Sequence, residues 1–174
     1  SLASEGNKQY ARALWMIELA INKSPRTAML YYQRGRVHWH LGNYAKSVES
    51  YNVAIKENPK FLDAHLFLAE LYFRDQNFKL AESHFSAATE MAPNQTAAVA
   101  GLAETRSLLG NANSAIELYE RAVSLSPRSL VFRFKLAALY EDVQKDYAQA
   151  LTAYKRIKTI IVESRSPANE QPVD

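Results

Sequence analysis

The stretch that organises this chain runs from Pro25 to Pro59 and reads PRTAMLYYQRGRVHWHLGNYAKSVESYNVAIKENP. Its layout recurs, because prolines stand at positions 25, 59, 93 and 127, each 34 residues after the last. Other columns keep this period: a small column of Gly35, Ala69, Ala103 and Ala137, an aromatic column of Tyr51, Phe85 and Tyr119, a second small column of Ala54, Ala88 and Ala122, and a turn column of Asn43, Asn77 and Asn111. Several columns that share one period indicate a repeat architecture in which each unit packs on its neighbours.

The repeat resembles the tetratricopeptide repeat family, in which an aromatic residue is followed at fixed distances by Leu, a small residue, Tyr, Ala, Phe and Pro. The unit from 60 to 93 carries this order as His65, Leu68, Ala69, Tyr72, Ala81, Phe85 and Pro93. In the last unit the order slips by one residue after Tyr140, so we place one extra residue in the turn at 144–146. The family's leading Trp is absent, and its column holds Tyr31, His65, Val99 and Arg133.

The resemblance implies an all-α fold: a right-handed α-solenoid of antiparallel helix pairs, with about four full repeats and a half repeat at the N-terminus. We expect one solenoid over residues 1–162, with a half repeat at 7–25 and repeats at about 26–59, 60–93, 94–127 and 128–162. We place the helices at 8–23, then in pairs at about 27–41 and 44–57, 61–75 and 78–91, 95–109 and 112–125, and 129–143 and 147–162.

Both ends of the chain are predicted to lack helix. Gly6 is expected to break the chain before the first helix, because glycine weakens a helix interior. Residues 163–174 contain few apolar side chains and are expected to form a disordered tail.

Composition narrows the classes of function. Hydrophobic residues make up 48% of the 174 residues, and no apolar run is long enough to span a bilayer. No charged start followed by an apolar stretch indicates a signal peptide. The 21 basic and 18 acidic residues leave a net charge of +3, which gives no strong attraction to nucleic acid or to an anionic membrane. The absence of cysteine excludes disulfides and thiolate metal sites and does not fix the compartment.

No catalytic or metal-binding constellation stands out, so we expect no enzyme activity, no cofactor and no metal. His38 and His40 are two residues apart, which points them to nearly opposite sides of a helix. His65 and His84 are interpreted as packed histidines. The basic cluster at 155, 156 and 158 is interpreted as a solvated helix face, with a phosphate or membrane role as the alternative.

In the tetratricopeptide repeat family the first helix of each pair lines a concave groove. That placement predicts a peptide-binding groove made of Tyr32, Arg36, Trp39, His40, Leu66, Phe67, Glu70, Phe73, Arg74, Ala100, Gly101, Glu104, Phe134 and Lys135. Aromatic anchors carry much of the energy at protein interfaces, and this set is rich in them. The alternative is that the aromatic residues pack on one another. Gly101 either leaves a depression for a ligand backbone or allows tight helix packing.

Two functions remain open at this point. The first is a non-catalytic scaffold that binds a protein or peptide in the groove. The second is a structural or self-associating segment of a larger protein. Some family members hold a partner's C-terminal carboxylate with a Lys and Asn set, and that set is missing here. The mixed charges of the groove argue against a nucleic-acid partner.

The N-terminal half repeat predicts a second surface. In the register above, a preceding first helix would cover a face made of Tyr10, Leu14, Ile17 and Ile21. An uncovered apolar face marks an interface or an aggregation liability. We therefore expect upstream sequence, or a second copy in a homo-oligomer, to cover this open end.

Overall fold

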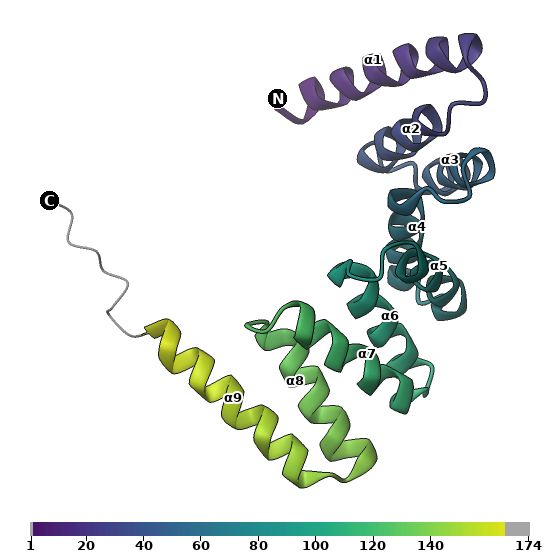
Figure 1. Ribbon diagram of the computed structural model, residues 1–174. Coiled ribbons are helices and arrows are strands. Elements are labelled where there is room, and N and C mark those ends of the chain that lie inside the picture. Colours follow the sequence, from purple (N-terminus) through teal and green to yellow (C-terminus); the bar gives the residue numbers. More distant parts are fainter. Residues whose placement is uncertain (1, 166–174) are drawn as a thin grey trace, which may run out of the picture. The chain divides into compact units, whose positions relative to one another are not determined.

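The computed structural model describes residues 2–165, and within that range every regular element is a helix (Figure 1). The chain divides into two compact units, Ser1–Pro93 and Asn94–Asp174. The predicted all-α fold of successive helix pairs is confirmed. The part of the predicted tail at 166–174 lies outside the described residues, while the last helix continues to Arg165, past its predicted end at 162.

The first unit contains one single helix and two antiparallel pairs. The helices are α1 (Leu2–Lys23), α2 (Ala28–His40), α3 (Tyr44–Glu57), α4 (Leu62–Arg74) and α5 (Phe78–Met91). Helices α2 and α3 pack as one pair and α4 and α5 as the next, while α1 packs on α2. The bounds of the second helices agree with the predicted 44–57 and 78–91, and the first helices are one residue shorter at each end.

The second unit contains two further pairs. Its elements are α6 (Thr96–Leu108), α7 (Ala112–Leu125), α8 (Leu130–Leu139), the π-helical turn η1 (Tyr140–Gln144) and α9 (Tyr147–Arg165). Helices α6 and α7 form one pair, and α8 with η1 packs on α9 to form the other.

The predicted break at Gly6 is wrong, because α1 is continuous from Leu2 to Lys23. A glycine in a helix interior costs about 1 kcal/mol relative to Ala, which the remaining turns of a 22-residue helix can offset. Helix α1 aligns with the second helices of the full repeats, and it is eight residues longer than they are, at its N-terminal end.

The turn between the paired helices has a residue in the left-handed conformation at the equivalent position of every full repeat. Gly42 and Gly110 take φ values of 74° and 82°, as their predicted role at helix ends requires. Gln76 and Lys145 occupy the equivalent position with φ values of 58° and 55°, so a side chain is accommodated there at some cost in strain.

The extra residue of the last repeat lies in η1 and not in the predicted turn at 144–146. In three repeats the turn N–H bonds to the carbonyl five residues earlier, as in Asn43 to His38. In the fourth repeat the equivalent bond runs from Asp146 to Tyr140, six residues earlier. A π-helical turn is wider than an α-turn and takes up one additional residue, so the repeat register is restored by Tyr147.

The small column explains how closely the paired helices approach. A Cβ atom built on Gly35 would lie 2.7 Å from Cε1 of Tyr51, closer than packed atoms approach. The Ser47 hydroxyl donates to the Gly35 carbonyl at 2.8 Å, which ties α3 to α2 at the same point. Tyr51 is fully buried at the centre of the first unit's core, as Tyr119 is in that of the second.

Polar side chains replace the family's leading Trp in three of the four full repeats, and Val99 occupies the column in the other. The three polar side chains reach the carbonyl of the proline that ends the preceding repeat, six residues earlier. The Tyr31 hydroxyl donates to Pro25 at 2.8 Å, His65 Nε2 lies 3.1 Å from the Pro59 oxygen, and Arg133 donates to Pro127 at 2.9 and 3.0 Å. Three unrelated side chains thus make equivalent contacts that hold α2, α4 and α8 to the preceding turn.

Candidate functional site

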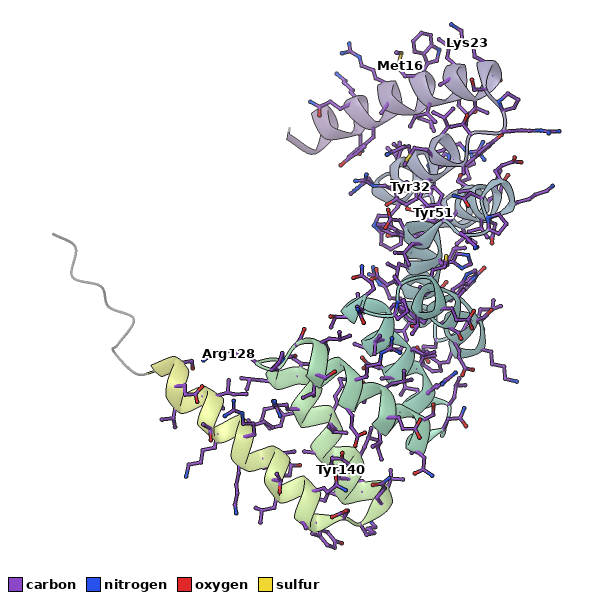
Figure 2. All side chains as sticks on the ribbon, viewed as in Figure 1. Met16, Lys23, Tyr32, Tyr51, Arg128 and Tyr140 are labelled. Atoms are coloured by element: carbon purple, nitrogen blue, oxygen red, sulfur yellow. The ribbon has the colours of Figure 1, made fainter. Side chains whose placement is uncertain are left out.

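The predicted groove residues lie on the first helices of the repeats, and each of the two units carries its own set of them. In the first unit they come from α2 and α4, and in the second from α6 and α8. Figure 2 shows the side chains on these helices, with Tyr32 labelled in the first unit. Each unit is described by itself.

The aromatic side chains nearest the middle of the first unit serve its core. Tyr32 is only 8% exposed, and its ring packs on Tyr51, Phe61 and Phe67 at centroid distances of 4.9 to 5.9 Å. Phe67 stacks on Tyr51 at 5.4 Å. The prediction of free aromatic anchors is therefore wrong for Tyr32, where the alternative of internal packing holds.

Two further aromatic residues form equivalent pairs one repeat apart. Trp39 packs on Tyr44 at 4.7 Å, and Phe73 packs on Phe78 at 5.6 Å. Each pair joins the end of a first helix to the start of the second. The Arg74 guanidinium lies over the Trp39 ring at 5.1 Å, so a cation–π contact joins α4 to α2 at this half-buried site.

Charged groups of both signs surround these half-buried rings. Arg36, Glu70 and Arg74 are exposed, and Leu66 is half-buried. His40 is also exposed, and its ring stacks on Tyr10 of α1 at 4.9 Å with an interplanar angle of 6°. The first unit thus offers a mixed-charge surface with aromatic edges, and α1 covers part of its outer end.

The second unit contains a cavity of about 310 Å³ between the ends of two first helices. Its lining comprises Glu104, Ser107, Leu108, Tyr119, Lys135, Ala138, Leu139, Asp142 and Val143. The predicted residues Glu104 and Lys135 meet here, because the Lys135 ammonium donates directly to the Glu104 carboxylate. Tyr119 is buried, and burial followed by the nearby Glu104 charge raises the pKa of its hydroxyl.

Sequence reasoning missed the two exposed apolar residues of this cavity. Leu108 and Val143 are 54% and 48% exposed. Leu108 ends α6, and Val143 belongs to η1, the turn that takes up the extra residue. The sequence could have indicated Leu108 as a surface residue, because it is a leucine at the end of a first helix. The direction of Val143 depends on a π-helical turn, which no local sequence pattern predicts.

The remaining predicted residues of the second unit lie outside this lining. Phe134 is 48% exposed, with its ring 6.3 Å from Tyr154. Ala100 and Gly101 are half-buried, and the Thr105 hydroxyl donates to the Gly101 carbonyl at 2.7 Å.

The predicted open face at the N-terminus is wrong in its residues. Ile21 is buried, and Tyr10, Leu14 and Ile17 are half-buried, with Tyr10 stacked on α2. The exposed apolar side chains of α1 are Trp15, Met16 and Leu19, which are 66%, 57% and 42% exposed. Helix α1 turns the predicted residues toward the rest of the chain and exposes a neighbouring face that contains Trp15, Met16 and Leu19.

His65 and His84 contact each other instead of being isolated packed histidines. Their Nδ1 atoms are 3.1 Å apart, and Tyr72 stacks on His84 at 5.6 Å. Burial, and then the neighbouring His65, lower the pKa of His84 to about 4. Over residues 2–165, no three His, Asp or Glu side chains are grouped closely enough to hold a metal ion. No helix in the same range is long and apolar enough to cross a bilayer.

Comparisons with known proteins agree with the repeat architecture. The family described as Tetratricopeptide repeat matches residues 3–60, 32–96 and 102–166. Anaphase-promoting complex subunit 3 of Schizosaccharomyces pombe (strain 972 / ATCC 24843) is 27% identical over 153 residues, which is 88% of this chain and 23% of that protein. The chain therefore spans less than a quarter of that relative's length.

Solved structures show the same fold at low sequence identity. MamA from Desulfovibrio magneticus RS-1, from residue 41 to its end, has a TM-score of 0.77 and 18% identity, and the match covers 95% of this chain and 96% of that one. YrrB, described as a TPR protein with an unusual peptide-binding site, has a TM-score of 0.76 and 19% identity over 91% and 81% of the two chains.

Proposed function

Because this chain belongs to the tetratricopeptide repeat family, we propose that it is a non-catalytic scaffold that binds a peptide or protein segment on its first helices. The observation that carries the proposal is the cavity lined by Glu104, Lys135 and Leu108 in the second unit. A cavity of about 310 Å³ lies at the small end of the range for ligand pockets and suits one side chain of a bound segment.

Exposed apolar side chains around the cavity support binding of a segment longer than one residue. Leu108, Phe134 and Val143 are each about half exposed, which gives a partner apolar area to cover. Burying such area contributes roughly 25 cal/mol per Å². The relatives support a binding role by their descriptions, one as a subunit of a complex and one as having a peptide-binding site.

Charges on the first helices restrict the kind of partner. Glu104 and Lys135 neutralise each other in the second unit, and the first helices of the first unit carry both signs of charge in Arg36, Arg74 and Glu70. A nucleic acid requires a basic surface that releases counterions, which this mixture does not provide. We therefore propose a partner segment of mixed or low charge, bound through apolar contacts with weak salt dependence.

Peptides selected from a random display library on the purified chain test this proposal. We expect Leu108→Ala with Phe134→Ala to weaken the selected peptides about tenfold or more, because truncating an interface anchor costs over about 1 kcal/mol. The matched control is Leu151→Ala, since Leu151 is as exposed as Leu108 but lies on a second helix. Equal affinity for all variants, or equal losses in control and test, would overturn the proposal.

A second candidate function, self-association, is favoured by the exposed face of α1. Met16 lies 34 residues before Ser50, so the two residues occupy equivalent repeat positions. Ser50 is only 1% exposed, because the first helix of its repeat covers it. No first helix covers α1 within the described residues, and we propose a second copy of the chain as the occupant of this face.

Light scattering over a wide concentration range tests self-association. We expect the mass to rise with concentration, and Met16→Glu to abolish the rise by placing a charge in the apolar contact. Leu80→Glu is the control, because Leu80 is also an exposed apolar residue but lies on α5. A monomeric mass at every concentration would exclude this candidate.

A further inference from the structure

A second cavity of the Asn94–Asp174 unit lies between α8 and α9 and shares no residue with the one at Glu104 and Lys135. Its volume is about 550 Å³, and it is lined by Arg133, Tyr140, Ala148, Gln149, Thr152, Ala153 and Arg156. Tyr140 is labelled in Figure 2. The described lining contains two arginines and no acidic residue, so the charge of this cavity differs from that of the mixed groove surface.

The room for this cavity comes from a small residue at a repeat position that is larger in the two preceding repeats. With the one-residue offset of the last repeat, Ala153 corresponds to Leu118, to His84 and, in the first full repeat, to the small residue Ser50. In the second repeat that larger side chain stacks on Tyr72, the equivalent of Tyr140. Ala153 leaves the corresponding space beside Tyr140 open.

One arginine of the cavity is held in a fixed orientation. Arg133 Nε and Nη2 donate to the Pro127 carbonyl at 3.0 and 2.9 Å. A guanidinium has five N–H donors in a rigid plane, so three remain for other acceptors. Because the planar group is already oriented, a ligand binding to it loses little side-chain freedom.

The second arginine adds a like charge, and the carboxylate that pairs with it is shared with a third arginine. Arg133 and Arg156 line the same cavity, and burial, followed by the Arg156 charge, lowers the pKa of Arg133. The nearest carboxylate to Arg156 is that of Glu163 at 3.9 Å, and Arg128 contacts the same group at 3.4 Å. Two guanidinium groups around one cavity favour an anion between them.

The neighbouring carboxylates have other partners. The Tyr140 hydroxyl donates to Glu120, and the Gln149 amide donates to Asp146 at 3.0 Å. Thr152 and Gln149 add further polar groups to the wall of the cavity. The Thr152 hydroxyl already donates to the Ala148 carbonyl at 2.9 Å, so the two guanidinium groups are the main donors that an incoming anion would meet. Such an anion would compete with Glu163, outside the lining, for Arg156.

We propose that this cavity binds a phosphate monoester. A phosphate monoester carries about −1.5 to −2 charge near neutral pH and three acceptor oxygens, which match the two cations and their free N–H groups. A carboxylate has one charge and two oxygens and would leave one arginine without a partner. The basic cluster around Arg156 thereby gains a role as one wall of a phosphate site.

Binding of three small probes tests the proposal by amide chemical shifts of the whole chain. The probes are N-acetyl-O-phosphoserine amide, inorganic phosphate and N-acetyl-serine amide. We expect the first two to shift the signals of Arg133, Gln149 and Thr152 in a saturable manner, and the unphosphorylated probe to leave them unchanged. Tighter binding of phosphoserine than of inorganic phosphate would identify a phosphorylated side chain as the source, and the reverse would overturn the monoester in favour of the free ion.

Two matched variants locate the binding energy. We expect Arg156→Gln to weaken the phosphate probes about tenfold, since a charge-assisted hydrogen bond is lost. Lys158→Gln removes the same charge from the same helix outside the cavity lining and should change the affinity less than twofold. Equal losses in the two variants would show attraction to diffuse positive charge and overturn the proposal. An absence of saturable shifts at the three residues would overturn it as well.

Discussion

Single side chains decide how closely the paired helices approach. The ring of Tyr51 rests against the bare backbone of Gly35, while Ala occupies the same column in the other repeats. Tyr51 also stacks on Phe67 of the next first helix, so its ring is held from both sides. The residue at position 35 therefore sets the geometry of α2, α3 and α4 together.

Gly35→Ala should destabilise the first unit. The new Cβ would lie 2.7 Å from the Tyr51 ring, so the ring or the helix must move, and we expect a loss of about 1–3 kcal/mol despite the better helix propensity of Ala. Gly6→Ala is the control, because a Cβ there meets nothing within 4 Å and should stabilise α1 by up to about 1 kcal/mol. Urea unfolding of both variants measures the difference. A stabilised Gly35→Ala would contradict the packing described here.

The His65–His84 pair predicts a pH dependence of stability. The folded pKa of His84, about 4, lies below its unfolded value near 6.5, so the unfolded chain binds more protons between these limits. The contribution of neutral His84 to the free energy of unfolding is present above pH 6.5 and is lost as the pH falls toward 4. Burial also lowers the pKa of His38, so His38 changes the pH dependence of stability in the same direction.

His84→Leu isolates that contribution, since Leu118 fills the same column in the next repeat. We expect the variant to lose less unfolding free energy than the wild type between pH 7 and pH 4.5, with the remaining slope coming from His38. Urea unfolding at several pH values measures both slopes. Identical slopes would mean that His84 titrates in the folded chain as it does in the unfolded one.

At the scale of elements, the period of 34 residues was sufficient to predict the paired helices. Proline and the turn column ended each helix within one residue of its observed bound in the first three full repeats. Two elements escaped this reasoning. The start of α1 was missed because one glycine was treated as a break, and η1 was missed because a one-residue insertion can enter either a loop or a wider helical turn.

Deleting Gln144 should convert η1 into ordinary α-helix. The last repeat would then have the length of the others, so we expect the free energy of unfolding to stay within about 1 kcal/mol of wild type. Deleting Gln76 is the matched control, because that turn has no surplus residue and its left-handed position would be lost, at a cost of about 2 kcal/mol or more. Urea unfolding compares the two deletions. Equal losses would show that the fourth repeat requires its extra residue.

For the whole molecule, the sequence predicted the fold class and the helices that carry the candidate surface. It could not predict the cavity at Glu104 and Lys135, because the two residues come from helices in different repeats and the far wall depends on η1. It overestimated the aromatic anchors, since period alone does not tell whether a ring such as Tyr32 turns toward solvent or toward the core. Exposure depends on the side chains of neighbouring repeats.

The central claim is that first helices, and not second helices or the outer face of α1, bind the partner. Amide hydrogen exchange of the chain with and without a selected library peptide tests this claim most directly. We predict slower exchange around Ser107–Leu109 of α6 and Lys135–Val143 of α8 and η1 on peptide addition, with α7 and α9 unchanged. Protection confined to the second helices, or to residues 15–19 of α1, would contradict it.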